Sequence, residues 1–322
     1  MLNPKEIHNI RELVHAAAKT YGGKDYMRYM KNGEINSISF YDFKEATDSI
    51  SAWTMEQNKK FGRSVKVAML SPNSALYAKI LFGVMCGGGI SVPMDAQITQ
   101  EALCNCLNRA EVDIVLYDKT IKLDRENIYN KCKTITSIFY MKDEESFDCV
   151  DITEQYKGIV CEPEINEKDC AIIIFTSGTT GVEKGVMLSH ANLIDTTFNA
   201  DFDPAVQLSI LPMHHAFGLK ADFLVALNIA STTCFFDGMD KLGEALHMYQ
   251  PSGSNMVPMI ANALYSKIVI LSRQTDKSLE ECKELVYGKN MKQIIKSRNE
   301  EVSTLLEVIR KKEFYKENSE HG

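Results

Sequence analysis

The sequence predicts an α/β protein built from doubly wound sheets with helices on both faces. Short apolar segments rich in β-branched residues alternate with longer segments in which apolar residues recur at helical spacing. Helical segments separate consecutive predicted strands, which is the connection that parallel neighbours require. One segment, Ile172, Ile173, Ile174 and Phe175, lacks polar alternation and is typical of a strand buried on both faces.

Elements of the first half follow one another at regular intervals. Asn32-Gly33 is the turn signal of a polar hairpin between the first two helices. Gly87, Gly88 and Gly89 follow a helix and precede a strand, which is the reverse of a dinucleotide fingerprint, so they end a helix. Helices are predicted over residues 7–20, 40–59, 74–86 and 101–110, and strands over 65–70, 90–95, 112–117 and, weakly, 135–140. The segment from 65 to 95 is therefore expected to form a parallel β-α-β unit.

The second half repeats the alternation after surface connections over residues 118–168. Ser189 suits the N-cap of a helix over 190–199. A strand is expected to end at Pro212. Further strands are predicted over 185–188, 230–236 and 251–258, and a helix over 241–250. We expect a first α/β subdomain over residues 1–168, a second and incomplete one over 169–295, and a helical tail over 296–322.

Composition excludes several classes of protein. The formal charge of −7 over 322 residues argues against a nucleic-acid-binding surface. No apolar run reaches the length of a transmembrane segment and the N-terminus lacks the apolar core of a signal peptide, so a cytoplasmic location is predicted. The nine cysteines are scattered without zinc-ligand spacing, which indicates reduced thiols.

A glycine-rich loop follows the apolar strand. Its glycines allow main-chain N–H groups to approach an anion, its hydroxyls add donors, and its lysine adds positive charge, which suits a nucleotide triphosphate. The alternative is a solvated turn. A Walker A loop is excluded, because Glu183 precedes the lysine and Gly185 follows it. The candidate nucleotide-binding residues are Thr176, Ser177, Gly178, Thr179, Thr180, Gly181 and Lys184.

This loop resembles the signature of the adenylate-forming (AMP-binding) superfamily, which includes acyl-CoA synthetases, luciferases and the adenylation domains of peptide synthetases. The usual form has proline before the lysine, where this chain has Glu183. Residues 83–95, a small-residue turn into a strand that ends Val-Pro-Met-Asp, resemble a second motif of the superfamily.

A third motif surrounds two adjacent histidines. The pattern Leu-Pro-x-x-His-x-Phe-Gly over residues 211–218 is similar to that of fatty-acyl CoA ligases. The resemblance implies that His215, and not His214, lies beside an acyl-adenylate, and that residues from Phe217 onward line the approach to the carboxylate pocket. His190 also matches a histidine that the family often has, but a structural or surface histidine is the favoured interpretation.

The resemblance implies a two-step reaction. ATP and a carboxylic acid give an acyl-adenylate, and a thiol, usually that of coenzyme A, then takes the acyl group. Magnesium is the implied metal, with Thr180 as its ligand. A fatty acid is the favoured substrate and an amino acid the second choice.

The resemblance ends near residue 295. The aromatic-Gly-x-Thr-Glu and Thr-Gly-Asp motifs, the hinge and the C-terminal lysine of the family have no counterpart, so a truncated ligase with little activity alone is expected. Two alternatives remain open: a pseudoenzyme or regulatory partner that contacts another protein through a helix over 299–322, and an ATP-binding protein of another kind.

Overall fold

The chain divides into two compact units, residues 1–236 and residues 237–322. The computed structural model describes residues 1–141, 152–176, 183–199, 203–256, 258–275, 277–279 and 281–282. The boundary after Phe236 differs from the predicted boundary after residue 168. The reason is that the apolar strand preceding the glycine-rich loop pairs with a strand of the predicted first subdomain, so both belong to one sheet.

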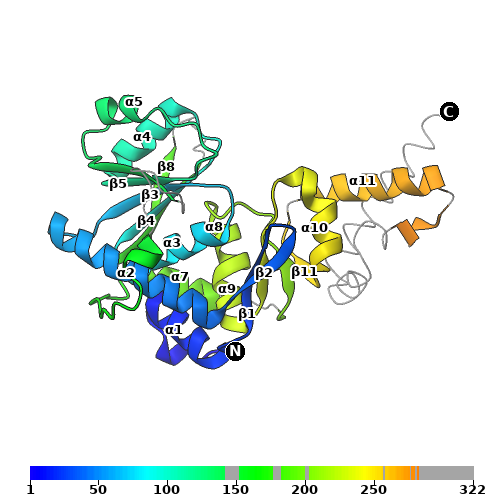
Figure 1. The fold of residues 1–322 in the computed structure, drawn as a ribbon, viewed down its shortest axis with the longest axis horizontal. Helices are drawn as coiled ribbons and strands as arrows, with labels where there is room; N and C mark the ends of the chain where they lie inside the picture. The colour runs from blue at the N-terminus through cyan, green and yellow to red at the C-terminus, as the bar shows by residue number, and fades with distance from the viewer. Residues whose placement is uncertain are drawn as a thin grey trace. The chain divides into compact units, whose positions relative to one another are not determined.

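The first unit contains a six-stranded sheet with helices on either side (Figure 1). Its strands lie in the order β6-β5-β3-β4-β7-β8, and all pairs are parallel except β7 with β8. They are β3 (Lys66–Leu70), β4 (Ile90–Met94), β5 (Ile114–Tyr117), β6 (Ser137–Tyr140), β7 (Cys170–Thr176) and β8 (Lys184–Ser189). The predicted β-α-β unit is confirmed, because β3 and β4 pair in parallel across the helix α3 (Ala75–Cys86).

Alternate residues of β3 face opposite sides of this sheet, as the pleat of a strand requires. Val67 and Met69 belong to one apolar cluster with residues of α3 and three further helices, α1 (Ile10–Tyr21), α2 (Phe40–Phe61) and α7 (His190–Phe198). Ala68 and Leu70 belong to a second cluster, which includes residues of α4 (Gln100–Ala110) and α5 (Arg125–Lys131). Helices therefore cover both faces, as Figure 1 shows, and the predicted fold class is confirmed.

A second sheet of the first unit contains strands from both ends of the unit. Its strands within this unit lie in the order β9-β10-β1-β2, and they are β1 (Asp25–Lys31), β2 (Glu34–Ser39), β9 (Val206–Leu208) and β10 (Thr232–Cys234). The predicted hairpin joins β1 and β2, with Asn32 at φ +55° and Gly33 at φ +81°. Both residues have the left-handed backbone that a two-residue hairpin turn requires.

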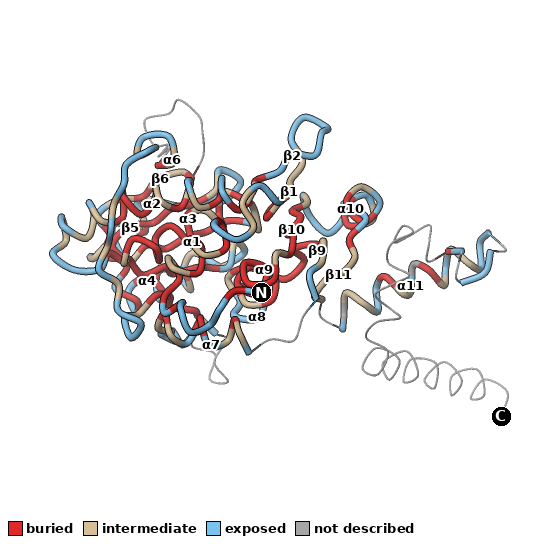
Figure 2. Tube along the Cα trace, turned by 90° about the horizontal axis from the view of Figure 1, so that it is seen from below, coloured by how far each residue is buried: buried red, intermediate tan, exposed pale blue. Residues whose placement is uncertain are grey.

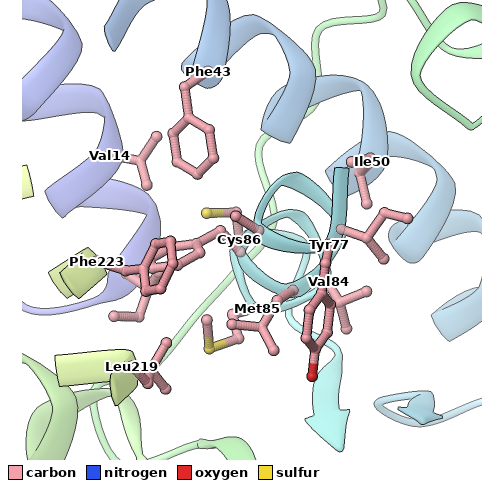
Figure 3. Packing of buried hydrophobic residues seen from close by; sticks show 14 of the residues in the cluster. Val14, Phe43, Ile50, Tyr77, Val84, Met85, Cys86, Leu219 and Phe223 are labelled. Atoms are coloured by element: carbon pink, nitrogen blue, oxygen red, sulfur yellow. The ribbon is translucent and has the colours of Figure 1, made fainter. Parts of the chain in front are cut away.

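The helix α3 lies in the middle of the apolar core and contacts both sheets, through β4 and β1. Figure 3 shows side chains of several elements gathered around it. Figure 2 shows that most of the buried residues of the first unit lie along α1, α2, α3 and the strands of the sheets. The labelled members of the cluster in Figure 3 are Val14, Phe43, Ile50, Tyr77, Val84, Met85, Cys86, Leu219 and Phe223.

Some predicted boundaries move. The strand expected to end at Pro212 ends at Leu208, because its partner β10 is only three residues long and the ladder extends by one further bond, from the N–H of Ser209 to the carbonyl of Cys234 (2.9 Å). Among its described residues, the segment 118–168 contains two helices that the sequence did not predict, α5 and the short α6 (Ile152–Gln155). Ser189 is the N-cap of α7 as predicted, and Asn192 completes a capping box.

The remaining elements of the first unit are η1 (Pro4–Glu6), α8 (Ala216–Gly218), the π-helical η2 (Leu219–Leu224) and α9 (Val225–Ile229). The second unit contains η3 (Met239–Lys241), α10 (Leu242–Tyr249), β11 (Gly253–Ser254) and α11 (Pro258–Thr275). Among the residues that the structure describes, no helix combines the length and hydropathy needed to cross a membrane. The charge-rich residues 142–145, residues 288–295, where a strand is also expected, and the helical tail expected over 296–322 lie outside the described residues.

Candidate functional site

The carboxyl end of the six-stranded sheet carries the polar residues from which a site can be built. In parallel strands these ends lie at one edge, and open α/β sheets bind their ligands there. Asn73 follows β3, Asp95 follows β4 and Thr176 ends β7. The parallel pairs β3 with β4 and β4 with β7 bring these three positions to the same edge.

The glycine-rich loop leaves the sheet at this edge. β7 and β8 are antiparallel, and their pairing sets Thr176 opposite Lys184 at the loop end of the hairpin. Both residues are exposed, so the hydroxyl and the ammonium group are accessible to a ligand. The structure therefore brings the first and last of the predicted nucleotide-binding residues together. Ser177, Gly178, Thr179, Thr180 and Gly181 lie outside the described residues.

The two predicted histidines lie near the same edge. Their ring centroids are 4.2 Å apart, with His214 half-buried and His215 exposed. Burial, assisted by the neighbouring His215, lowers the pKa of His214 to about 4, although the negative charge of Asp95 opposes this shift. His214 is therefore a neutral imidazole at pH 7.

His215 occupies the position just before a helix. It is the N-cap residue of α8, which η2 and α9 continue as far as Ile229. The N–H of His215 donates to the carbonyl of Pro212 (3.1 Å), and the N–H of Leu219 donates to the carbonyl of His215 (3.0 Å). Gly218 is required here because a Cβ atom would lie 2.4 Å from the Pro212 carbonyl oxygen. The turn before the helix is thus tightly folded against its first residues.

The π-helical segment that follows is stabilised by side chains from the second sheet. Gln207 on β9 donates its side-chain amide to the carbonyl of Asp222 (3.1 Å), and the hydroxyl of Thr233 on β10 donates to the same carbonyl. The hydroxyl of Tyr26 on β1 donates to the carbonyl of Phe223 (3.1 Å). These donors satisfy carbonyls of a helix with irregular pitch, a feature often found at functional sites.

His190 does not join the histidine pair. It is buried at the start of α7, and its Nδ1 atom accepts a hydrogen bond from the N–H of Ile10 (3.3 Å). The structural interpretation of this residue is therefore confirmed. Burial lowers the pKa of His190 to about 4.

Acid is expected to destabilise the fold through His190. In the unfolded chain His190 gains a proton near the ordinary pKa of 6.5, and in the folded chain only near 4. The contribution of His190 to stability is therefore fully present above pH 6.5 and is lost as the pH falls towards 4. Between pH 7 and pH 5 the loss from this residue is about 2 kcal/mol. Urea unfolding at both pH values should therefore show a smaller pH dependence for His190→Gln than for the wild type. Measurements above pH 7.5 give the stability of the variant and that of the wild type with its His190 neutral. An equal pH dependence in the two proteins would contradict the prediction.

The sequence did not single out Asn73, whose side chain bonds to the segment before His214. Its position after a buried strand at the carboxyl edge is a weak signal, and the preceding proline and following serine favoured a helix start instead. Among the described residues no group of three or more His, Cys, Asp or Glu side chains is arranged to hold a metal ion. The predicted metal ligand Thr180 lies outside them.

Comparisons with known proteins agree with this architecture. Residues 14–302 match the protein family described as "AMP-binding enzyme". The chain is 23% identical over 265 residues to a long-chain-fatty-acid–CoA ligase of Salmonella typhimurium, covering 71% of this chain and 46% of the relative. The chain thus spans about half the length of the curated relatives it matches.

Two solved structures share the fold. A long-chain-fatty-acid-CoA ligase from Archaeoglobus fulgidus superposes with a TM-score of 0.70 at 19% identity, over 84% of this chain and 55% of that one. A fatty acyl-adenylate ligase from L. pneumophila, solved with acyl adenylate and pyrophosphate, gives a TM-score of 0.66 at 18% identity, over 89% and 49%.

Proposed function

Because this chain belongs to the family of AMP-binding enzymes, we propose that it binds ATP and a carboxylic acid and takes part in joining them as an acyl-adenylate. In this reaction a carboxylate oxygen of the acid forms a bond to the α-phosphorus of ATP, and the bond from that phosphorus to pyrophosphate breaks. A thiol, that of coenzyme A in our proposal, then takes the acyl group and AMP leaves.

The observation that carries this proposal is the pairing of Thr176 with Lys184 at the loop end of the β7-β8 hairpin. A hydroxyl donor and an exposed ammonium group flank a loop of glycines and hydroxyl residues at the carboxyl edge of a parallel sheet. Polyphosphate binding uses these donors, since main-chain and hydroxyl groups bond to phosphate oxygens and a lysine offsets their charge.

Hydroxyl oxygens of the chain also suit the implied magnesium ion as ligands. Mg²⁺ is usually held by one or two protein oxygens together with substrate phosphates, so a hydroxyl such as that of Thr180 beside the polyphosphate is a suitable partner. The ion supplies positive charge to the phosphate oxygens when bound. The role of Lys184 is to hold the same oxygens from the protein side.

A fatty acid is the proposed substrate class. The relatives named above are ligases of long-chain or fatty acyl groups. In this chain Phe217 follows the histidine pair and its side chain is 55% exposed, which offers apolar surface beside His215. Burial of acyl methylene groups against such surface stabilises a complex by about 0.8 kcal/mol each. We propose His215 as the residue beside the acyl-adenylate and His214 as its neutral neighbour.

Binding of stable acyl-adenylate analogues tests this function. Isothermal titration of the purified chain with dodecanoyl, acetyl and leucyl sulfamoyl-adenosine should show that the dodecanoyl compound binds at least about tenfold more tightly than the other two. Exchange of labelled pyrophosphate into ATP with dodecanoate measures the complete activation step in the same preparation. Absence of binding by all three analogues would refute the proposed function, and a preference for the leucyl compound would redirect it to an amino acid.

A cytoplasmic location and a protein partner bound through residues 299–322 remain predictions of the sequence.

A further inference from the structure

Asn73 connects two segments that lie 136 to 140 residues apart in the sequence. Its side-chain amide donates to the hydroxyl of Ser209 (2.9 Å) and to the carbonyl of Leu211 (2.7 Å). Its side-chain oxygen accepts a hydrogen bond from the N–H of Met213 (2.9 Å). One side chain in the turn after β3 thus makes three hydrogen bonds to the five residues that precede His214.

These three hydrogen bonds begin where the backbone pairing of β9 with β10 ends. The ladder between β9 and β10 extends only to the N–H of Ser209, and two later backbone bonds are local, from Ile210 to Leu208 and from His215 to Pro212. Leu211 and Met213 are buried, at 4% and 0% exposed. Polar backbone groups of buried residues need partners, and Asn73 supplies them for the Leu211 carbonyl and the Met213 N–H.

We propose that Asn73 is a positioning residue for the histidine pair. By fixing Leu211 and Met213 it sets where His214 and His215 stand at the carboxyl edge of the sheet. The part of this inference that concerns what His215 contacts rests on the proposed function. The positioning itself rests on the three hydrogen bonds of Asn73.

The chemistry of the side chain explains why asparagine suits this position. The neutral side-chain amide of asparagine carries both N–H donors and an oxygen acceptor on a short side chain. Aspartate keeps an acceptor for the Met213 N–H but sets a carboxylate against the Leu211 carbonyl. Alanine leaves both buried backbone groups, the Leu211 carbonyl and the Met213 N–H, without their partner. The resulting shift matters because a displacement of about 1 Å in a reacting group can lower a rate by about a hundredfold.

Histidine NMR of the whole chain tests the positioning role directly. In Asn73→Ala and Asn73→Asp we expect the ring signals of His214 and His215 to move, while those of His190 on α7 stay in place. The pKa of His214, about 4 in the wild type, is expected to rise by about one unit, a tenfold change in proton affinity, as its ring loses burial and its distances to His215 and Asp95 change.

Asn36→Ala is the matched control. Asn36 lies in the exposed hairpin, and its side-chain amide donates to the carbonyl of Glu34 only two residues away (3.2 Å). This variant should leave the His214 and His215 signals unchanged. If Asn73→Ala fails to fold, Asn73→Asp decides, because it retains the bond to Met213. Unchanged His214 and His215 signals in Asn73→Asp would overturn the proposal.

Affinity for dodecanoyl sulfamoyl-adenosine separates this inference from the proposed function. The Asn73 variants should bind the analogue about tenfold more weakly than the wild type and Asn36→Ala. Shifted histidine signals in a chain whose wild type binds no analogue would refute the function and support the positioning role. Full affinity with unshifted signals in both Asn73 variants would refute the positioning role and support the function.

Discussion

Replacement of Lys184 by alanine is expected to weaken binding of ATP by about 30-fold, which corresponds to about 2 kcal/mol. Lys184 begins β8 opposite Thr176, at the end of the hairpin that the glycine-rich loop closes. Its side chain is exposed, so in the free protein its removal leaves no buried group without a partner. The loss should therefore appear in ligand affinity and not in stability.

Isothermal titration with ATP and magnesium measures this effect. Lys184→Arg keeps the charge and should retain most of the affinity. The matched control is Lys168→Ala, which removes an exposed lysine just before the amino end of β7, at the opposite edge of the sheet. Added salt should reduce the difference in ATP affinity between Lys184→Ala and the wild type, because salt screens an exposed charge. Equal losses in Lys168→Ala and Lys184→Ala would show that general charge, and not the loop, binds the nucleotide.

Replacement of Gly83 by alanine is expected to lower the free energy of unfolding by about 3 kcal/mol. Gly83 lies in α3 against α2, and a Cβ atom there would meet the Cβ atom of Ile50 at 2.5 Å and its Cγ2 atom at 2.6 Å. Ile50 is fully buried, and its Cβ is fixed by the helix backbone. The two helices would have to separate, which disturbs the core that both sheets share.

Thermal and urea unfolding of two further variants sharpen this test. Gly23→Ala is the control, because a Cβ atom at Gly23 meets nothing within 4 Å. The double variant Gly83→Ala with Ile50→Ala should be no more stable than Gly83→Ala, because alanine retains the Cβ atom that causes the overlap. Recovery of stability in the double variant would show that the outer atoms of Ile50 set the distance between the helices.

The local chemistry of the chain was sufficient for much of this fold. The Asn32-Gly33 turn, the Ser189 N-cap and the strand before the glycine-rich loop each depend on residues within a few positions of one another, and each was predicted correctly. The loop and histidine motifs indicated a family that the comparisons confirm. The end of β9 was predicted four residues too late, because the length of a strand depends on its partner β10.

What the sequence by itself determined is the order of most helices and strands, the α/β class and the residue types of the candidate site, because periodicity and turn chemistry act over short distances. Only the tertiary structure decided that β7 and β8 complete the sheet of β3 to β6, that Gly83 must lack a side chain, and that Asn73 holds the segment before His214. Each of these depends on atoms brought together from distant parts of the chain. Packing and hydrogen bonding between such segments require three-dimensional distances, which no local pattern contains.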